Sequence, residues 1–344
     1  MEIKEFINKY DPQNQFDVLK NTYRQIEYAR DNKIDLKNIS TEKIKNIVIC
    51  GLGGSAISGD FVREMFSDEL KIPVAVNRNY SLPAYVDENS LIIISSYSGN
   101  TEETVSCFNE AIKIKCKIVS ISTGGKVAEI AEQNNIPFIK LQEGFQPRYT
   151  LAMSFFTLIN LFQQLNLILP QDEFLDTSLQ LIKKKGDEFS ADENEALNIA
   201  QQLIGFIPVI YSCSDSTYSV GYRLKSQFNE NSKLHAFHNV IPELNHNEII
   251  GWESFSEKLL HAKIINIIDD DYHPQIKKRF EITKELAKRT GADSIILKSN
   301  EKNKKVRIMD LIYLGDWITY YLAVLRGYDP SEIDFIYELK QRLA

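Results

Sequence analysis

The chain has 344 residues, of which 43% are hydrophobic and 25% are charged, as is typical of a globular protein with room for about two domains. Its formal net charge of −7 disfavours a nucleic-acid partner, which would need a basic face. The polar start Met1-Glu2-Ile3-Lys4 and the lack of any apolar run near ~20 residues predict no signal peptide and no membrane span. The four cysteines form no CxxC pair, so we expect buried, reduced thiols and a cytoplasmic location.

Strand-like and helix-like segments alternate along the chain, which is typical of parallel α/β sheets. The strands predicted in the first half are 46–50, 74–76, 91–95, 117–121 and 137–139, and helices are expected at 102–115 and 126–134. Residues 150–200 carry no strong strand pattern and are expected to be helical. Strands resume at 208–211, 234–237, 262–267 and 294–297, and a helical tail from Arg307 breaks at residues 327–330.

The two halves of the chain resemble each other weakly, because residues 47–66 and 209–228 both pass from a strand through a polar loop into a helix. We therefore predict an α/β fold with two similar domains, each a parallel sheet between two layers of helices, and an active site in the cleft between them. The predicted division is an N-terminal helical arm (1–45), a first α/β domain (46–150), a helical linker (151–200) and a second α/β domain with C-terminal helices (201–344).

A glycine-rich loop, Gly51-Leu52-Gly53-Gly54-Ser55, leaves the first predicted strand and enters a helix. Glycines allow close approach of the backbone to a ligand, and the N–H groups at the start of a helix attract anions. A dinucleotide site remains an alternative, although its G-x-G-x-x-G pattern would need a glycine where Ala56 stands. The acids about 20 residues further on, Asp68 and Glu69, are expected inside a helix rather than at the end of a strand.

A second loop, residues 95–101, follows an apolar strand and is rich in hydroxyl groups. Hydroxyls can donate to phosphate oxygens, and the helix that follows adds backbone N–H donors. Such a neutral cradle suits a phosphate that is held but not transferred, since transfer would call for lysine or Mg²⁺ at the loop. The alternative is an ordinary capped turn, because serine and threonine are the usual helix N-caps. The loop thus predicts a ligand class and no reaction.

The two loops together resemble the SIS (sugar isomerase) domain. More narrowly, residues 146–148, 229–231 and 245–249 with Gly251-Trp252 resemble the bifunctional phosphoglucose/phosphomannose isomerase family, over roughly residues 46–340. The resemblance implies two SIS-type subdomains, a homodimer, and neither a cofactor nor a metal. It also implies a substrate phosphate site formed by four hydroxyl residues and two backbone positions, namely Ser55, Ser96, Ser98, Thr101, Gly53 and Gly54.

The same resemblance implies the catalytic residues of an aldose–ketose isomerase, which opens a sugar ring, moves a proton between C1 and C2, and stabilises the enediolate between them. Glu230 would be the base, as a carboxylate is in other enolising enzymes. His246 would open the ring together with Lys340, and would reach the site of the other subunit. Arg148 would stabilise the enediolate charge. These roles imply interconversion of glucose 6-phosphate, and of mannose 6-phosphate, with fructose 6-phosphate in glycolysis and gluconeogenesis; the residue that lines C2 is sought near 329–331.

Alternatives remain open at this stage. A SIS protein that senses a sugar phosphate without catalysis would keep residues 96–101 but could lose Glu230, His246 and Arg148. An amide-transferring glucosamine 6-phosphate synthase would need an N-terminal cysteine nucleophile domain. By residue type alone, Glu230 could be a solvated surface glutamate, Arg148 a member of a surface salt bridge, and Lys340 an ordinary lysine of a C-terminal helix. A metal site at His235 and His238, which flank a predicted strand, lacks a third ligand in register.

Overall fold

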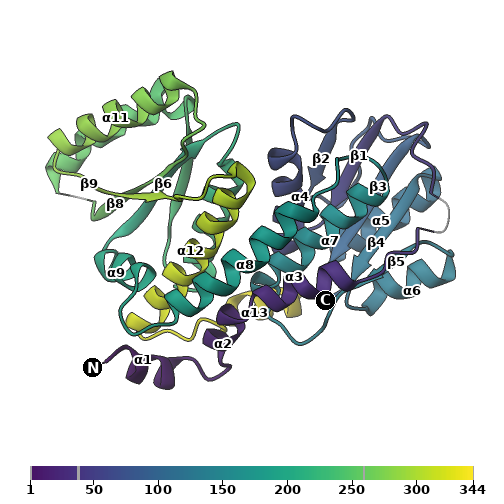
Figure 1. Ribbon diagram of the computed structural model, residues 1–344, viewed down its shortest axis with the longest axis horizontal. Helices are drawn as coiled ribbons and strands as arrows, with labels where there is room; N and C mark the ends of the chain where they lie inside the picture. The colour runs from purple at the N-terminus through teal and green to yellow at the C-terminus, as the bar shows by residue number, and fades with distance from the viewer. Residues whose placement is uncertain (1, 37–38, 259, 344) are drawn as a thin grey trace. The chain divides into compact units, whose positions relative to one another are not determined.

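The structure is a computed structural model that describes residues 2–36, 39–258 and 260–343. It divides into two compact units, which Figure 1 shows in one view. The first unit is Thr22–Leu179, and the second unit combines Met1–Asn21 with Gln180–Ala344. The division falls inside α8 (Asp172–Phe189), within the segment predicted as a linker, and it separates the predicted N-terminal arm at Asn21.

The first unit is built around sheet A, whose strands are all parallel and lie in the order β2-β1-β3-β4-β5. Its elements after the N-terminal helix are β1 (Asn46–Cys50), α4 (Gly53–Met65), β2 (Val74–Asn77), β3 (Ser90–Ser96), α5 (Glu102–Ile114), β4 (Lys117–Ser122), α6 (Gly125–Gln133) and β5 (Phe138–Lys140). In the sequence, α3 (Tyr23–Asp31) precedes these elements and α7 (Leu151–Gln164) follows them. Each strand predicted in this half is confirmed to within about two residues, as boundaries generally are.

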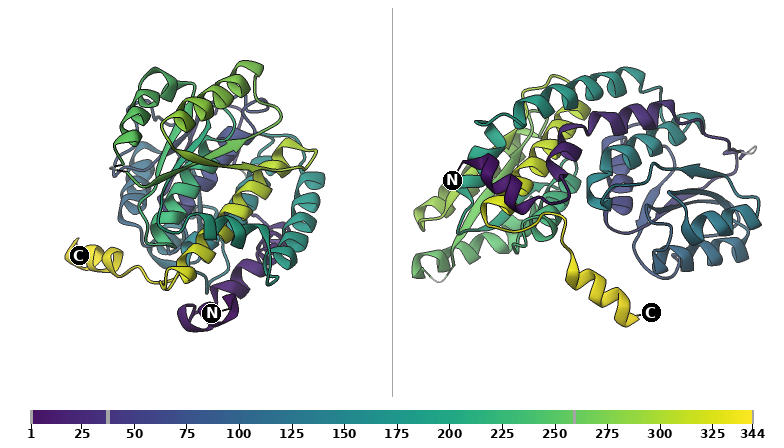
Figure 2. Two further views of the ribbon diagram at one scale, coloured as in Figure 1. Left: turned by 90° about the vertical axis from the view of Figure 1, so that its left-hand side faces the viewer. Right: turned by 90° about the horizontal axis from the view of Figure 1, so that it is seen from below.

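Sheet A is covered on both faces, as Figure 1 and the right-hand view of Figure 2 show. On one face Val48 and Ile92 pack with Phe108 of α5 and Val127 of α6. On the other face α4 lies so close that a Cβ on Gly59 would meet the Ile49 side chain at 3.1 Å. Burial on both faces explains why the central strands are nearly continuous apolar runs in the sequence.

The second unit repeats this plan with sheet B, whose parallel strands lie in the order β7-β6-β8-β9. Its elements are α1 (Ile3–Tyr10), α2 (Gln15–Lys20), α9 (Glu195–Gln202), β6 (Ile207–Cys213), α10 (Tyr218–Glu230), β7 (Phe237–Ile241), β8 (Ala262–Ile268), α11 (Pro274–Arg289), β9 (Asp293–Lys298), α12 (Lys304–Leu325) and α13 (Asp334–Leu343). The order matches that of the first four strands of sheet A, with β6 in the place of β1. The predicted α/β class with two similar parallel sheets is therefore confirmed.

The strand predicted at 234–237 was misplaced, because the structure begins β7 at Phe237. The backbone before it serves the end of α10 instead. The N–H of Leu234 donates to the carbonyl of Phe228 at 3.2 Å, and the N–H of Ala236 donates to Asn229 Oδ1 at 3.1 Å. His238 consequently lies inside β7 rather than at its flank.

Helix α12 forms the centre of the second unit. Trp317 is fully buried on it and meets the Phe16 ring edge-on at 5.2 Å between centroids. The hydroxyl of Tyr320 donates to Asp11 Oδ2 at 2.8 Å, and that of Tyr313 donates to the Leu19 carbonyl at 2.7 Å. These contacts explain why the first 21 residues belong with the C-terminal half of the chain.

The expectation that no apolar segment is long enough to cross a membrane is wrong for this helix. Helix α12 spans 22 residues and contains a window with mean hydropathy 1.3, which suffices by length and composition. Of that window, 94% is buried inside the structure, as in the core helix of a folded domain. The four cysteines are free thiols; three are buried as expected, whereas Cys116 is partly exposed.

Candidate active site

The hydroxyl-rich loop lies at the carboxyl edge of sheet A, between β3 and α5. Ser96 is buried, and its Oγ lies 2.9 Å from Thr101 Oγ1 and accepts a hydrogen bond from the Gly99 N–H at 3.1 Å. Ser98 Oγ accepts from the Asn100 N–H at 3.3 Å. Thr101 stands at the N-cap of α5, yet among the described residues its hydroxyl caps no helix N–H. The hydroxyls of Ser96 and Ser98 thus bond N–H groups of the turn, whereas that of Thr101 is not used as a helix cap.

The glycine-rich loop reaches the same edge, since β1 and β3 pair in parallel and their carboxyl ends lie side by side. A Cβ on Gly51 would lie 2.6 Å from the Ser95 carbonyl oxygen, so only glycine allows this approach. Ser55 Oγ accepts a hydrogen bond from the Tyr97 N–H at 3.2 Å, which joins the two loops directly. The hydroxyl residues predicted from the sequence, together with the start of α4 at Gly53, thus gather at one sheet edge.

Gly99 fixes the shape of the hydroxyl-rich loop. Its φ of +70° is in the left-handed region, and a Cβ there would lie 1.8 Å from the Gly124 carbonyl oxygen. The loop is also held against the start of α6, where the Val127 N–H donates to the Gly99 carbonyl at 3.0 Å and Thr123 Oγ1 donates to the Tyr97 carbonyl at 2.7 Å. The loop is thus preformed by its own unit.

Arg148 lies in the same unit, in a 3₁₀ turn at Pro147–Tyr149, and is only 4% exposed. This burial disagrees with the alternative of a surface salt bridge for Arg148. A Cβ on Gly54 would lie 2.8 Å from the Pro147 carbonyl oxygen, so the turn lies against the start of α4. Gly54 thus allows the segment that carries Arg148 to approach the glycine-rich and hydroxyl-rich loops.

Tyr97 connects these parts, and sequence reasoning missed it. Its hydroxyl donates to the Gln142 carbonyl at 3.0 Å and accepts from the Phe145 N–H at 3.0 Å. Burial raises the pKa of Tyr97, so the hydroxyl keeps its proton. One side chain of the hydroxyl-rich loop thereby holds the segment that leads to Arg148. A tyrosine between two serines gives no sequence signal for such a tether.

Glu230 lies in the second unit, as the last residue of α10, and is half-buried. The end of that helix is fixed by α12. Gln227 Nε2 donates to Asp316 Oδ1 at 3.0 Å, Asn231 Nδ2 donates to Thr319 Oγ1 at 3.1 Å, and Ser232 Oγ donates to the Thr319 carbonyl at 2.7 Å. These bonds are made three residues before Glu230 and one and two residues after it, so its backbone position is well defined.

His246 and Lys340 lie in the second unit in different settings. His246 ends the 3₁₀ helix Glu243–His246 and is exposed, between anchored neighbours. Lys340 lies on α13, where none of the described residues 334–343 is buried. The structure therefore fixes the backbone around His246 but gives Lys340 no comparable surroundings within its unit.

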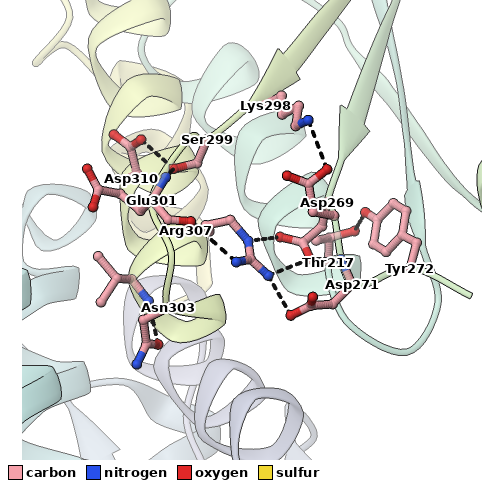
Figure 3. Close-up of polar contacts among 12 residues, drawn as sticks. Thr217, Asp269, Asp271, Tyr272, Lys298, Ser299, Glu301, Asn303, Arg307 and Asp310 are labelled. Carbon is pink, nitrogen blue, oxygen red and sulfur yellow. Dashed lines mark hydrogen bonds and ion pairs between the residues drawn. The ribbon is translucent and has the colours of Figure 1, made fainter.

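The carboxyl edge of sheet B, which Figure 3 shows, differs chemically from that of sheet A. The loop after β8 takes the topological place of the hydroxyl-rich loop but carries acids. Arg307 donates from Nε to Asp269 Oδ2 at 2.7 Å and from Nη2 to Asp271 Oδ2 at 2.6 Å, and its Nη1 donates to the Lys302 carbonyl at 2.8 Å. This edge is thus occupied by the chain's own ion pairs.

His238 is hydrogen-bonded within its own unit. Its Nε2 lies 2.7 Å from Ser212 Oγ on the neighbouring strand β6, and burial lowers the pKa of His238 to about 4. His235 lies outside the strand and is exposed. Within the part of the chain that the structure describes, no three or more His, Cys, Asp or Glu side chains are grouped as metal ligands.

Two parallel-sheet units and a hydroxyl-lined loop at the carboxyl edge of one of them define the SIS class of α/β proteins. In agreement, residues 192–343 match the family described as the bacterial phospho-glucose isomerase C-terminal SIS domain. The C-terminal domain of glucosamine-fructose-6-phosphate aminotransferase from Francisella tularensis has the same fold, with a TM-score of 0.68, 15% identity, and coverage of 96% of this chain and 98% of that one.

Relatives of known family extend over nearly the whole chain. The bifunctional phosphoglucose/phosphomannose isomerase of Caldicellulosiruptor bescii is 40% identical over 96% of this chain and 98% of its own length. That of Aquifex aeolicus is 35% identical over 95% of this chain and 98% of its own length. The chain therefore belongs to the bifunctional phosphoglucose/phosphomannose isomerase family, as the motifs in its sequence indicated.

Proposed function

We propose that the chain is an aldose–ketose isomerase that interconverts glucose 6-phosphate and mannose 6-phosphate with fructose 6-phosphate. The observation that carries the proposal is the hydroxyl-lined loop 96–101, preformed in a chain of this family. Glucose and mannose 6-phosphates differ only at C2 and give the same enediol, so one base can serve both. We look for the residue that lines C2 near residues 329–331.

The phosphate is held in the proposal by Ser55, Ser96, Ser98 and Thr101, with the backbone of Gly53 and Gly54 at the start of α4. Hydroxyl and N–H donors bind a dianion without transferring it. The anchor fixes one end of the sugar, so that C1 and C2 lie at a constant reach from Arg148 of the same unit. Such positioning lowers the entropic cost of the proton transfer.

Glu230 acts in the proposal as the base that moves the proton between C1 and C2. The guanidinium of Arg148 stabilises the enediolate, whose charge develops on O1 and O2. His246, assisted by Lys340, opens the ring by exchanging protons with the ring oxygen and O1. These residues cover both the proton transfers and the charge stabilisation, so the proposed mechanism requires neither a cofactor nor a metal ion. Activity should accordingly survive EDTA, and a loss that zinc restores would contradict this mechanism.

We also propose that the enzyme acts in the cytoplasm, in carbohydrate metabolism including glycolysis and gluconeogenesis. The proposed oligomer is a homodimer in which His246 completes the site of the partner subunit. It can be tested by mixing two inactive variants, Glu230→Gln and His246→Asn. In mixed dimers one site would combine an intact Glu230 with an intact His246. Random mixing should restore about a quarter of wild-type activity, because half the dimers are mixed and each has one intact site of two. Absence of any recovery in verified mixed dimers would show that His246 acts within its own chain.

The central experiment is a coupled assay that starts from fructose 6-phosphate and measures both aldose products. Glu230→Gln should abolish turnover while binding of a sugar-acid phosphate inhibitor is retained, and Glu281→Gln, an exposed glutamate on α11, serves as the control. Activity retained in Glu230→Gln would refute its role as the base. A wild-type chain that binds the inhibitor but makes neither aldose would instead be a sugar-phosphate-binding protein without catalysis.

A further inference from the structure

The segment that carries His246 is held on the side that precedes the histidine. Leu244 is fully buried in the core beneath sheet B. Asn245 Nδ2 donates to Thr283 Oγ1 of α11 at 2.8 Å, and its Oδ1 accepts from Arg279 Nη1 at 3.3 Å. The exposed imidazole is therefore presented by a backbone whose preceding residues are fixed to α11 and the core.

The side that follows His246 is held by a partly buried chain of polar side chains. Glu248 Oε1 accepts from the Tyr211 hydroxyl at 2.7 Å, and Oε2 accepts from Asn239 Nδ2 at 2.6 Å. The Tyr211 hydroxyl in turn accepts from Trp252 Nε1 at 2.7 Å. Tyr211 and Asn239 are partners in the β6–β7 register, so two adjacent strands present paired donors to one carboxylate.

Tyr211 is fully buried, so its hydroxyl needs hydrogen-bond partners within the protein. Burial, reinforced by Glu248, raises the pKa of Tyr211, so its hydroxyl is a donor throughout the range of ordinary assays. Hydrogen bonds to a carboxylate are shorter and stronger than those between neutral groups, and two of them on one carboxylate fix its orientation. Trp252 lies in the same 3₁₀ segment as Glu248, Glu248–Glu257, so this segment is bound to the sheet at two points.

We propose that the chain of hydrogen bonds Trp252–Tyr211–Glu248–Asn239 positions His246 for ring opening; the inference rests on the proposed function. The four residues touch no reacting atom in this account and are positioning residues. Because His246 is needed for ring opening and not for the proton transfer at C1 and C2, their loss should impair cyclic substrates selectively.

The test compares fructose 6-phosphate with 5-deoxyfructose 6-phosphate, which lacks the hydroxyl that closes the ring and stays open-chain. In Tyr211→Phe, kcat/KM with fructose 6-phosphate should fall by about tenfold to a hundredfold, as a misplaced catalytic group generally costs. Deuterium exchange from solvent into C1 of the 5-deoxy substrate should change by less than about twofold by the same reasoning. His246→Asn should show the same selectivity. Tyr272→Phe, which removes another buried tyrosine hydroxyl from this unit, is the control and should show no selectivity.

Equal losses with both substrates, or no loss with either, would overturn the inference. If Tyr211→Phe does not fold, Glu248→Gln keeps the size of this partly buried side chain, places an amide NH2 against one of its two donors, and should give a loss with the same selectivity. A selective loss in His246→Asn without one in either positioning variant would refute the inference while the proposed function stands. A wild-type chain that acts on neither substrate would refute the proposed function itself.

Discussion

Removal of the Tyr97 hydroxyl tests how the hydroxyl-rich loop is joined to the segment that leads to Arg148. In Tyr97→Phe the ring remains, and so does the backbone N–H that donates to Ser55 Oγ. What is lost is the hydroxyl that bridges the Gln142 carbonyl and the Phe145 N–H, each at 3.0 Å. The hydroxyls of the loop itself are unchanged. We expect the segment that leads to Arg148 to loosen while the phosphate anchor persists.

The size of the effect follows from the two lost hydrogen bonds. Neutral hydrogen bonds contribute about 0.5–1.5 kcal/mol each, so the tether is worth about 1–3 kcal/mol. If all of this free energy serves to hold Arg148 in the transition state, kcat falls by roughly 5- to 150-fold. Because the ring is half-buried and is retained, the packing contribution should not change.

The assay measures kcat and KM with fructose 6-phosphate, and the inhibition constant of inorganic phosphate as a probe of the anchor. Tyr97→Phe should lower kcat while the inhibition constant for phosphate stays within about twofold, because the phosphate donors are intact. Tyr85→Phe, which alters an exposed tyrosine of the same unit, is the control. A rise in the phosphate inhibition constant that matches the fall in kcat would refute the reasoning, as would wild-type kcat in the variant.

Two further predictions concern the stability of the second unit. Arg307→Met should lower the free energy of unfolding by about 3–5 kcal/mol in urea titrations, because the buried Asp269 carboxylate loses its partner; a loss below about 1 kcal/mol would contradict the importance of this ion pair. His238 has its pKa lowered to about 4 by burial, so below the ordinary value the unfolded chain binds a proton that the folded chain does not. Stability should therefore fall between about pH 6.5 and 4, by at most on the order of 3 kcal/mol, and unfolding curves of His238→Gln should lack this part of the pH dependence.

Most strands could be predicted from the sequence, and the one that was misplaced shows the limit. β1, β3 and β8 are buried on both faces, so they are short apolar runs in the sequence. β7 is an edge strand that reads Phe-His-Asn-Val-Ile and is only partly buried. The residues before it continue the apolar signal but are bonded to the end of α10. Local pattern alone does not reveal that competition for backbone hydrogen bonds.

Long-range contacts limited the prediction of units and of supporting residues in the same way. The first helices join the second unit through Phe16 and Trp317, which are about 300 positions apart, and no local pattern reports such a contact. Tyr97 and Tyr211 act through hydroxyls that reach other loops and strands. The hydroxyl-rich loop could be found, by contrast, because its residues are contiguous and the chemistry of their side chains is local.

The two sheet edges show how one topology serves different purposes. At sheet A the edge is lined by neutral hydroxyls in a loop shaped by Gly99, whereas at sheet B the equivalent edge is filled by Arg307 and its carboxylates. A sugar phosphate is thus expected at the first edge only, although the chain carries a net charge of −7. Donors at contact distance can overcome that charge, since charges farther than a Debye length, about 8 Å at physiological salt, are largely screened. The anchor therefore depends on the local geometry of the first unit and not on the net charge of the chain.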